Sequence, residues 1–117
     1  MSTVPNTDAI NVAVVRGVVS SDPRVRELPS GATVTNIEVT TRLGTGSVSV
    51  PVVVHDAIVT AATGDEVVVT GHVARRFFRA GGMTQSRTEL IADDVIKSTR
   101  TKSVEKALSA AIQRLSP

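Results

Sequence analysis

Hydrophobic and polar residues alternate in short runs along most of the chain, which is the pattern of β-strands. The runs are rich in β-branched residues and are bounded by Gly, Pro and Asp. Strands are predicted over residues 10–19, 32–42, 47–54, 66–76 and 84–96. A short extended piece over residues 24–28 precedes the turn Pro29-Ser30-Gly31 and is expected to form a hairpin with the second strand.

Two features between the strands carry further predictions. Gly17 interrupts a β-branched run, which indicates a bulge or a sharp bend in a small barrel. In residues 55–65, Asp56 has the residue type of a helix N-cap and Gly64 that of a helix stop. A short helix is therefore predicted between the third and fourth strands.

The two ends of the chain differ from the middle. Residues 1–9 are polar and are expected to form a flexible arm, followed by a folded domain over residues 10–98. In residues 99–117, apolar side chains recur at helical spacing, at Val104, Leu108, Ala111, Ile112 and Leu115. An amphipathic C-terminal helix is predicted, which either docks on the domain or pairs with another subunit.

The order of these elements predicts the fold class. Five strands with a short helix between the third and fourth form the layout of an OB-fold, a five-stranded Greek-key barrel. The predicted protein is thus mainly all-β, with a C-terminal helix added to the barrel.

Composition excludes several classes of function. The 117 residues suffice for one domain, and without Cys the chain has neither disulfides nor thiolate metal sites. No apolar run reaches the roughly 20 residues of a membrane span, so a cytoplasmic protein with no membrane contact is expected. His55 stands beside Asp56 but no partnered nucleophile is evident, and neither an enzyme nor a cofactor is expected.

The net charge of +2 is small, so any affinity for nucleic acid must come from local clusters of charge. One cluster is evident in residues 71–79, where Arg75, Arg76 and Arg79 surround Phe77 and Phe78. Basic residues that follow a phosphate backbone, beside rings that stack on bases, are typical of single-stranded nucleic-acid binding. The alternative is a hairpin with a solvated basic face and two core phenylalanines.

Three motifs occur in order along the chain: Val14-Val15-Arg16-Gly17-Val18-Val19, Asp22-Pro23-Arg24-Val25-Arg26 and Gly64-Asp65-Glu66-Val67-Val68-Val69-Thr70-Gly71. They resemble motifs of the bacterial single-stranded DNA-binding proteins of the tetrameric OB-fold type, with Arg76 and Phe78 at the family's Arg and aromatic positions. The resemblance covers about residues 10–98. It implies sequence-nonspecific binding of single-stranded DNA, in replication, repair or recombination, by a homo-oligomer, either a tetramer or a dimer.

The departures from that family are as informative as the matches. The chain has no Trp or Tyr, and three aromatic positions of the family fall in residues 43–46, at Ser49 and at His55. Members of the family carry a Gly-, Pro- and Gln-rich linker that ends in an acidic tip, which recruits replication proteins. A basic helix stands in that place here, so this recruitment is not expected. Weak binding is expected, and the alternative is a diverged OB-fold protein that serves subunit or protein–protein contact with little DNA affinity.

The candidate site follows from these observations. The nucleic-acid-binding candidates are Arg42, Arg75, Arg76, Arg79 and Arg87 as phosphate contacts, Phe78 as the stacking ring and His55 as a weak one. Strand alternation places Arg76 and Phe78 on one outer face, and Phe77 is expected to be structural. The Val-rich outer face of the fourth predicted strand is a candidate surface for oligomerisation. No catalytic or metal-binding residue is expected.

Overall fold

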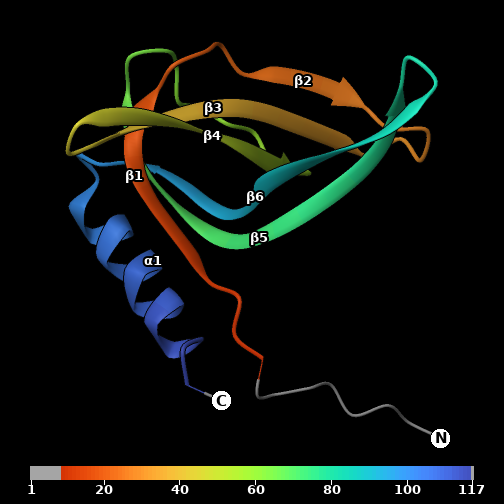
Figure 1. Ribbon diagram of the computed structural model, residues 1–117. Helices are drawn as coiled ribbons and strands as arrows, with labels where there is room; N and C mark the ends of the chain where they lie inside the picture. Colours follow the sequence, from red (N-terminus) through yellow and green to blue (C-terminus); the bar gives the residue numbers. More distant parts are fainter. Residues whose placement is uncertain (1–8, 117) are drawn as a thin grey trace, which may run out of the picture.

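The computed structural model describes residues 9–116, in which six strands curl around one core and a single helix lies against them (Figure 1). Residues 1–8 of the expected arm lie outside the described range. The elements are β1 (Ala13–Val19), β2 (Arg24–Glu27), β3 (Thr33–Leu43), β4 (Gly46–His55), β5 (Glu66–Ala80), β6 (Met83–Lys97) and α1 (Thr101–Gln113). All five predicted strands are present, and the extended piece forms β2.

The strands form one sheet in the order β1-β5-β6-β4-β3-β2, which closes where Val18 and Val19 of β1 pair with Thr40 and Val39 of β3. β4 and β6 run parallel, and every other pair is antiparallel. The result is a closed five-stranded barrel with β2 added to its β3 edge. The predicted OB-fold is confirmed.

The inward-facing side chains of the strands fill the barrel. Val67 and Val69 of β5 point inward together with side chains from the other strands. The buried core consists of Val19, Ile37, Val39, Val52, Val54, Ala61, Val67, Val69 and Leu90. Valine predominates because β-branched side chains fit a curved, pleated surface that is covered on one side.

Gly17 allows two strands to approach one another closely. A Cβ at Gly17 would lie 2.4 Å from the carbonyl oxygen of Thr40, so β1 can close onto β3 only with glycine at this position. Pairing of β1 with β5 continues through Gly17 without a bulge. The irregularity lies elsewhere, between Thr70 and Gly71, where Asp93 is an extra residue in β6.

The predicted helix in residues 55–65 is wrong. Asp56 has a φ of 50°, and its backbone N–H donates to the Thr33 carbonyl while its carboxylate accepts from the Thr33 N–H at 3.2 Å. Asp56 therefore ends the β3–β4 pairing in a left-handed conformation and does not begin a helix. Asp is favoured in both settings because its short side chain bonds nearby backbone groups.

The C-terminal helix is confirmed, and it docks on the domain (Figure 1). It contacts β5 and β6 through the buried Ala107 and Ala111, and Arg114 forms an ion pair with Asp93. Val68 and Thr70, on the outer face of β5, are buried within the single chain. That part of the Val-rich face is thus not available to another subunit in this arrangement. Among residues 9–116, no helix is long and apolar enough to span a membrane.

Candidate nucleic-acid interface

A groove of about 500 Å³ lies between the β1–β3 connection, which contains β2, and the β5–β6 hairpin. Its lining residues are Ser21, Asp22, Arg24, Arg26, Asn36, Ile37, Glu38, Arg76, Arg87 and Glu89. Sheet register brings them together from distant parts of the chain, because Arg24 pairs with Asn36 and Arg76 pairs with Arg87. OB-folds bind oligonucleotides on the corresponding strand face, between the corresponding loops.

A network of ion pairs holds two of the groove's arginines. Arg76 contacts Glu89 with Nε–Oε1 at 3.2 Å and Nη2–Oε2 at 3.4 Å. Arg87 lies 3.6 Å from the same carboxylate and donates to Oε2 of Glu38 at 3.0 Å. Because β4 lies between β6 and β3, the Arg87 side chain reaches across β4 to Glu38. Four arginines against three carboxylates leave the groove with one net positive charge.

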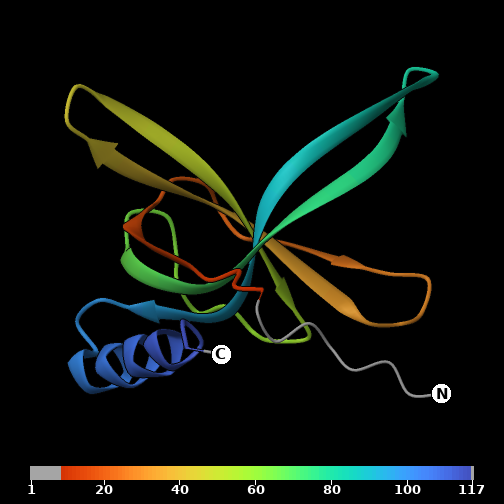
Figure 2. The ribbon, with the colours of Figure 1, turned by 60° about the horizontal axis from the view of Figure 1, so that its bottom comes forward.

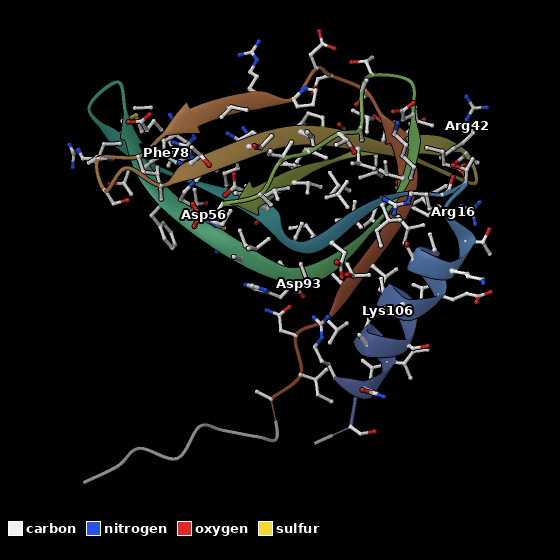
Figure 3. All side chains as sticks on the ribbon, turned by 180° about the vertical axis from the view of Figure 1, so that it is seen from behind. Arg16, Arg42, Asp56, Phe78, Asp93 and Lys106 are labelled. Atoms are coloured by element: carbon white, nitrogen blue, oxygen red, sulfur yellow. The ribbon has the colours of Figure 1, made fainter. Side chains whose placement is uncertain are left out.

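The ring of Phe78 lies beside this network. The Arg76 guanidinium carbon is 5.1 Å from the centroid of the Phe78 ring, within cation–π distance, and the ring is half-buried. Arg76 therefore contacts both the buried carboxylate and the ring. This arrangement fixes the ring at the hairpin side of the groove, where Figure 3 shows Phe78 close to the hairpin tip.

Arg24 and Arg26 are groove residues that the sequence reasoning missed. Both are exposed on β2, and neither forms an ion pair within residues 9–116. Their spacing of two in an extended segment could have indicated that they share one face. Their proximity to Arg76 depends on barrel closure, which the spacing alone does not reveal.

Three residues of the basic segment lie on the reverse face of the hairpin. Arg75 donates to the Ser86 hydroxyl from Nε at 3.2 Å and from Nη2 at 3.1 Å, and its guanidinium carbon is 5.4 Å from the Phe77 ring centroid. Arg79 donates to the Gly82 carbonyl at 2.9 Å. Phe77 is 65% exposed, so the prediction that it is structural is wrong.

The remaining candidates lie apart from the groove. Arg42 lies one residue before the end of β3 and lines a second hollow of about 580 Å³ with Arg16 and Glu66. Figure 3 shows Arg42 and Phe78 on opposite sides of the barrel, and in Figure 2 the β3–β4 and β5–β6 hairpins point in different directions. His55 is exposed at the end of β4, on the sheet face that carries Arg26, but outside the lining of the groove.

In the second hollow, the carboxylate of Glu66 accepts hydrogen bonds from two side chains. The Ser98 hydroxyl donates to its Oε1 at 2.7 Å, and Arg16 donates to the same atom at 2.9 Å. The hydrogen bond from Ser98, then that from Arg16 and its charge, lower the pKa of Glu66 below the ordinary value of 4.5.

No family model matches the chain, and no curated protein matches it. Among solved structures it is similar to that of Plasmodium falciparum SSB in complex with ssDNA, with a TM-score of 0.66 and 21% sequence identity. The match covers 76% of this chain and 95% of the Plasmodium chain. At this identity the likeness establishes the fold: the barrel is of the type found in that SSB.

Proposed function

We propose that this protein binds single-stranded DNA, without sequence specificity, in the groove between β2 and the β5–β6 hairpin. The observation that carries the proposal is the convergence of Arg24, Arg26, Arg76 and Arg87 with Phe78 from separate hairpins. No catalytic group or cofactor is required. A role in DNA replication, repair or recombination would follow from this activity.

The mechanism combines backbone contact with stacking. Arg24 and Arg26 are exposed and contact phosphates directly, whereas Arg87 must exchange its contact with Glu38 for a phosphate. Phe78 offers its ring to one base, and such stacking contributes about 1–3 kcal/mol per base. With a single ring beside the groove, the affinity of each domain is expected to be modest.

We also propose that the protein forms homo-oligomers, either dimers or tetramers. Exposed sheet edges and faces are common sites of self-association. Val14 and Val18 of β1 are 47% and 41% exposed, and β1 pairs with β3 only at its last two residues. This open part of β1 supports an assembly, because the face of β5 is already covered by α1.

A second candidate function is protein–protein contact with little DNA affinity. Glu38 and Glu89 favour it, because they neutralise Arg76 and Arg87 within the groove. Nucleic-acid sites usually present basic residues without such partners. The two candidates make opposite predictions for DNA binding.

Titration of fluorescently labelled oligo(dT) at low and at moderate salt distinguishes them. The DNA proposal predicts a measurable dissociation constant that weakens with salt, and about a tenfold loss for Phe78→Ala. Val48→Ala, which removes an exposed apolar side chain from β4, is the matched control and should leave affinity unchanged. Absence of binding even at low salt would overturn the proposal and favour protein–protein contact.

A further inference from the structure

The reverse face of the β5–β6 hairpin has the composition of a second nucleic-acid surface. Alternation along β5 places Arg75, Phe77 and Arg79 in one row, and their partners across the hairpin are Thr88, Ser86 and Thr84. The row is therefore an exposed ring between two guanidinium groups, beside three hydroxyl side chains.

This face differs from the groove in its charge. The chain has no acidic residue between Glu66 and Glu89, and the side chain of Glu89 contacts Arg76 and Arg87 on the groove face. Among residues 9–116, the hydrogen-bond partners of Arg75 and Arg79 are neutral, Ser86 and Gly82, whereas Arg76 and Arg87 contact carboxylates. A phosphate approaching the reverse face consequently displaces no carboxylate.

We propose that the Arg75–Phe77–Arg79 row is a second contact site for single-stranded DNA, with Phe77 as its stacking ring. The inference rests on the proposed function and extends it from the groove to the other side of the hairpin. One strand lies in the groove against Phe78, passes the hairpin tip and returns along the reverse face against Phe77.

The geometry of the ring suits stacking. Arg75 is held by two hydrogen bonds to Ser86 and lies over one side of the Phe77 ring, so the ring is oriented before any base arrives. With 65% of the residue exposed, the other side is open to a base. A base would then be stacked on a ring that is itself stacked on a guanidinium group.

The hairpin tip is formed by two glycines, which leave room for a strand beside it. Gly81 and Gly82 form the turn with φ values of 60° and 78°, and neither carries a side chain that would obstruct the path. Arg79 donates to the Gly82 carbonyl and so places its charge beside the tip. Positive charge thus continues from Arg76, past the tip, to Arg75.

Because the chain has no Trp, a single tryptophan in place of either phenylalanine is a specific reporter. The experiment measures the fluorescence of Phe77→Trp and of Phe78→Trp during titration with two lengths of oligo(dT). One, of about 8 nucleotides, lies within the usual site size of about 4–16 nucleotides for one OB domain, and the other, of about 35 nucleotides, exceeds it. We expect the long oligonucleotide to quench both reporters. The short one should quench mainly the Phe78→Trp reporter.

Affinity for the long oligonucleotide is measured in parallel for Phe77→Ala and Phe77→Leu. Both substitutions remove the aromatic face, so both should weaken binding about tenfold. Leucine keeps the apolar bulk, so retention of affinity in Phe77→Leu alone would indicate an apolar contact and would contradict stacking.

The outcomes separate this inference from the proposed function. If the Phe78→Trp reporter is quenched while the Phe77→Trp reporter and the affinity of Phe77→Ala do not change, the reverse face is not a DNA site and the groove remains one. If the wild-type protein shows no binding to either oligonucleotide, the proposed function itself is wrong. If Phe77→Ala instead changes the oligomeric state with DNA affinity intact, the row is a protein contact and the inference is overturned.

Discussion

Arg76 contacts its diagonal neighbour Glu89 across the β5–β6 hairpin at two points, with Nε–Oε1 at 3.2 Å and Nη2–Oε2 at 3.4 Å. The glutamate is only 5% exposed, whereas the arginine is 44% exposed at its side chain. The carboxylate thus lies at the base of the groove and orients a guanidinium that still reaches solvent. The same pairing removes part of the positive charge that would attract DNA.

An acidic residue that lines the groove is expected to weaken binding. Glu38 is partly exposed and accepts from Arg87 at 3.0 Å, so it competes with phosphate for that arginine. Glu38→Gln should raise the affinity for oligo(dT) roughly fivefold, corresponding to ~1 kcal/mol. Glu105→Gln removes the same charge on the exposed surface of α1 and is the control. Equal affinities of Glu38→Gln and wild type would show that Arg87 does not contact the DNA.

Gly71, at the irregularity in the β5–β6 pairing, is expected to be essential for the fold. A Cβ at Gly71 would lie 1.9 Å from the carbonyl oxygen of Ile91, which belongs to backbone and cannot turn aside. Gly71→Ala should destabilise the protein by about 3 kcal/mol or more, measured by urea unfolding. Gly46→Ala, where a Cβ meets nothing within 4 Å, should be nearly neutral. Similar unfolding midpoints for the two variants would contradict the close approach of β5 and β6.

Docking of α1 depends on two small side chains. Ala107 and Ala111 are buried against the sheet, so a carboxylate at position 107 would be forced into an apolar contact. Ala107→Asp should lower stability by about 2–3 kcal/mol. Ser109→Asp, at an exposed position of the same helix, should change it little. If both variants unfold at the same urea concentration, α1 is not docked in solution.

The hydrogen bonds that Glu66 accepts from Ser98 and from Arg16 predict a dependence of stability on pH. The folded pKa of Glu66 is lowered below 4.5, so the ionised group stabilises the fold above that pH. The contribution is lost as the pH falls from 4.5 through the lower folded pKa. The unfolding midpoint of Glu66→Gln should therefore fall less steeply than that of the wild type as the pH is lowered. If the midpoints of the two proteins fall in parallel below pH 4.5, the pKa of Glu66 is not shifted.

Much of the fold could be predicted from the sequence because it depends on local patterns. The continuous run of valines in residues 67–69 is β-branched and apolar, which indicates a buried strand without any knowledge of its neighbours. Asp56 shows the limit of such reasoning. An Asp before small apolar residues is typical of a helix N-cap, yet the partner that fixes its conformation here is Thr33, 23 positions away.

The candidate site was predicted only in part, for a related reason. Arg76, Phe78 and Arg87 belong to one hairpin, so strand alternation alone places them together. Arg24 and Arg26 reach the same groove only because β2 pairs with β3. Arg42 lies near the end of the same strand β3 but lines a different hollow, and nothing in its sequence neighbourhood indicates that it lies outside the groove.

The salt dependence of oligo(dT) affinity in single arginine variants tests the central claim most directly. Each phosphate contact on a single strand contributes about 0.7 to the slope of log K against log salt concentration. If DNA lies in the groove, Arg24→Ala and Arg76→Ala should each reduce that slope by about this amount. Lys102→Ala, on the exposed surface of α1, and Arg42→Ala, outside the groove, should leave it unchanged. Slopes that fall for Arg42→Ala but not for Arg24→Ala or Arg76→Ala would contradict the account.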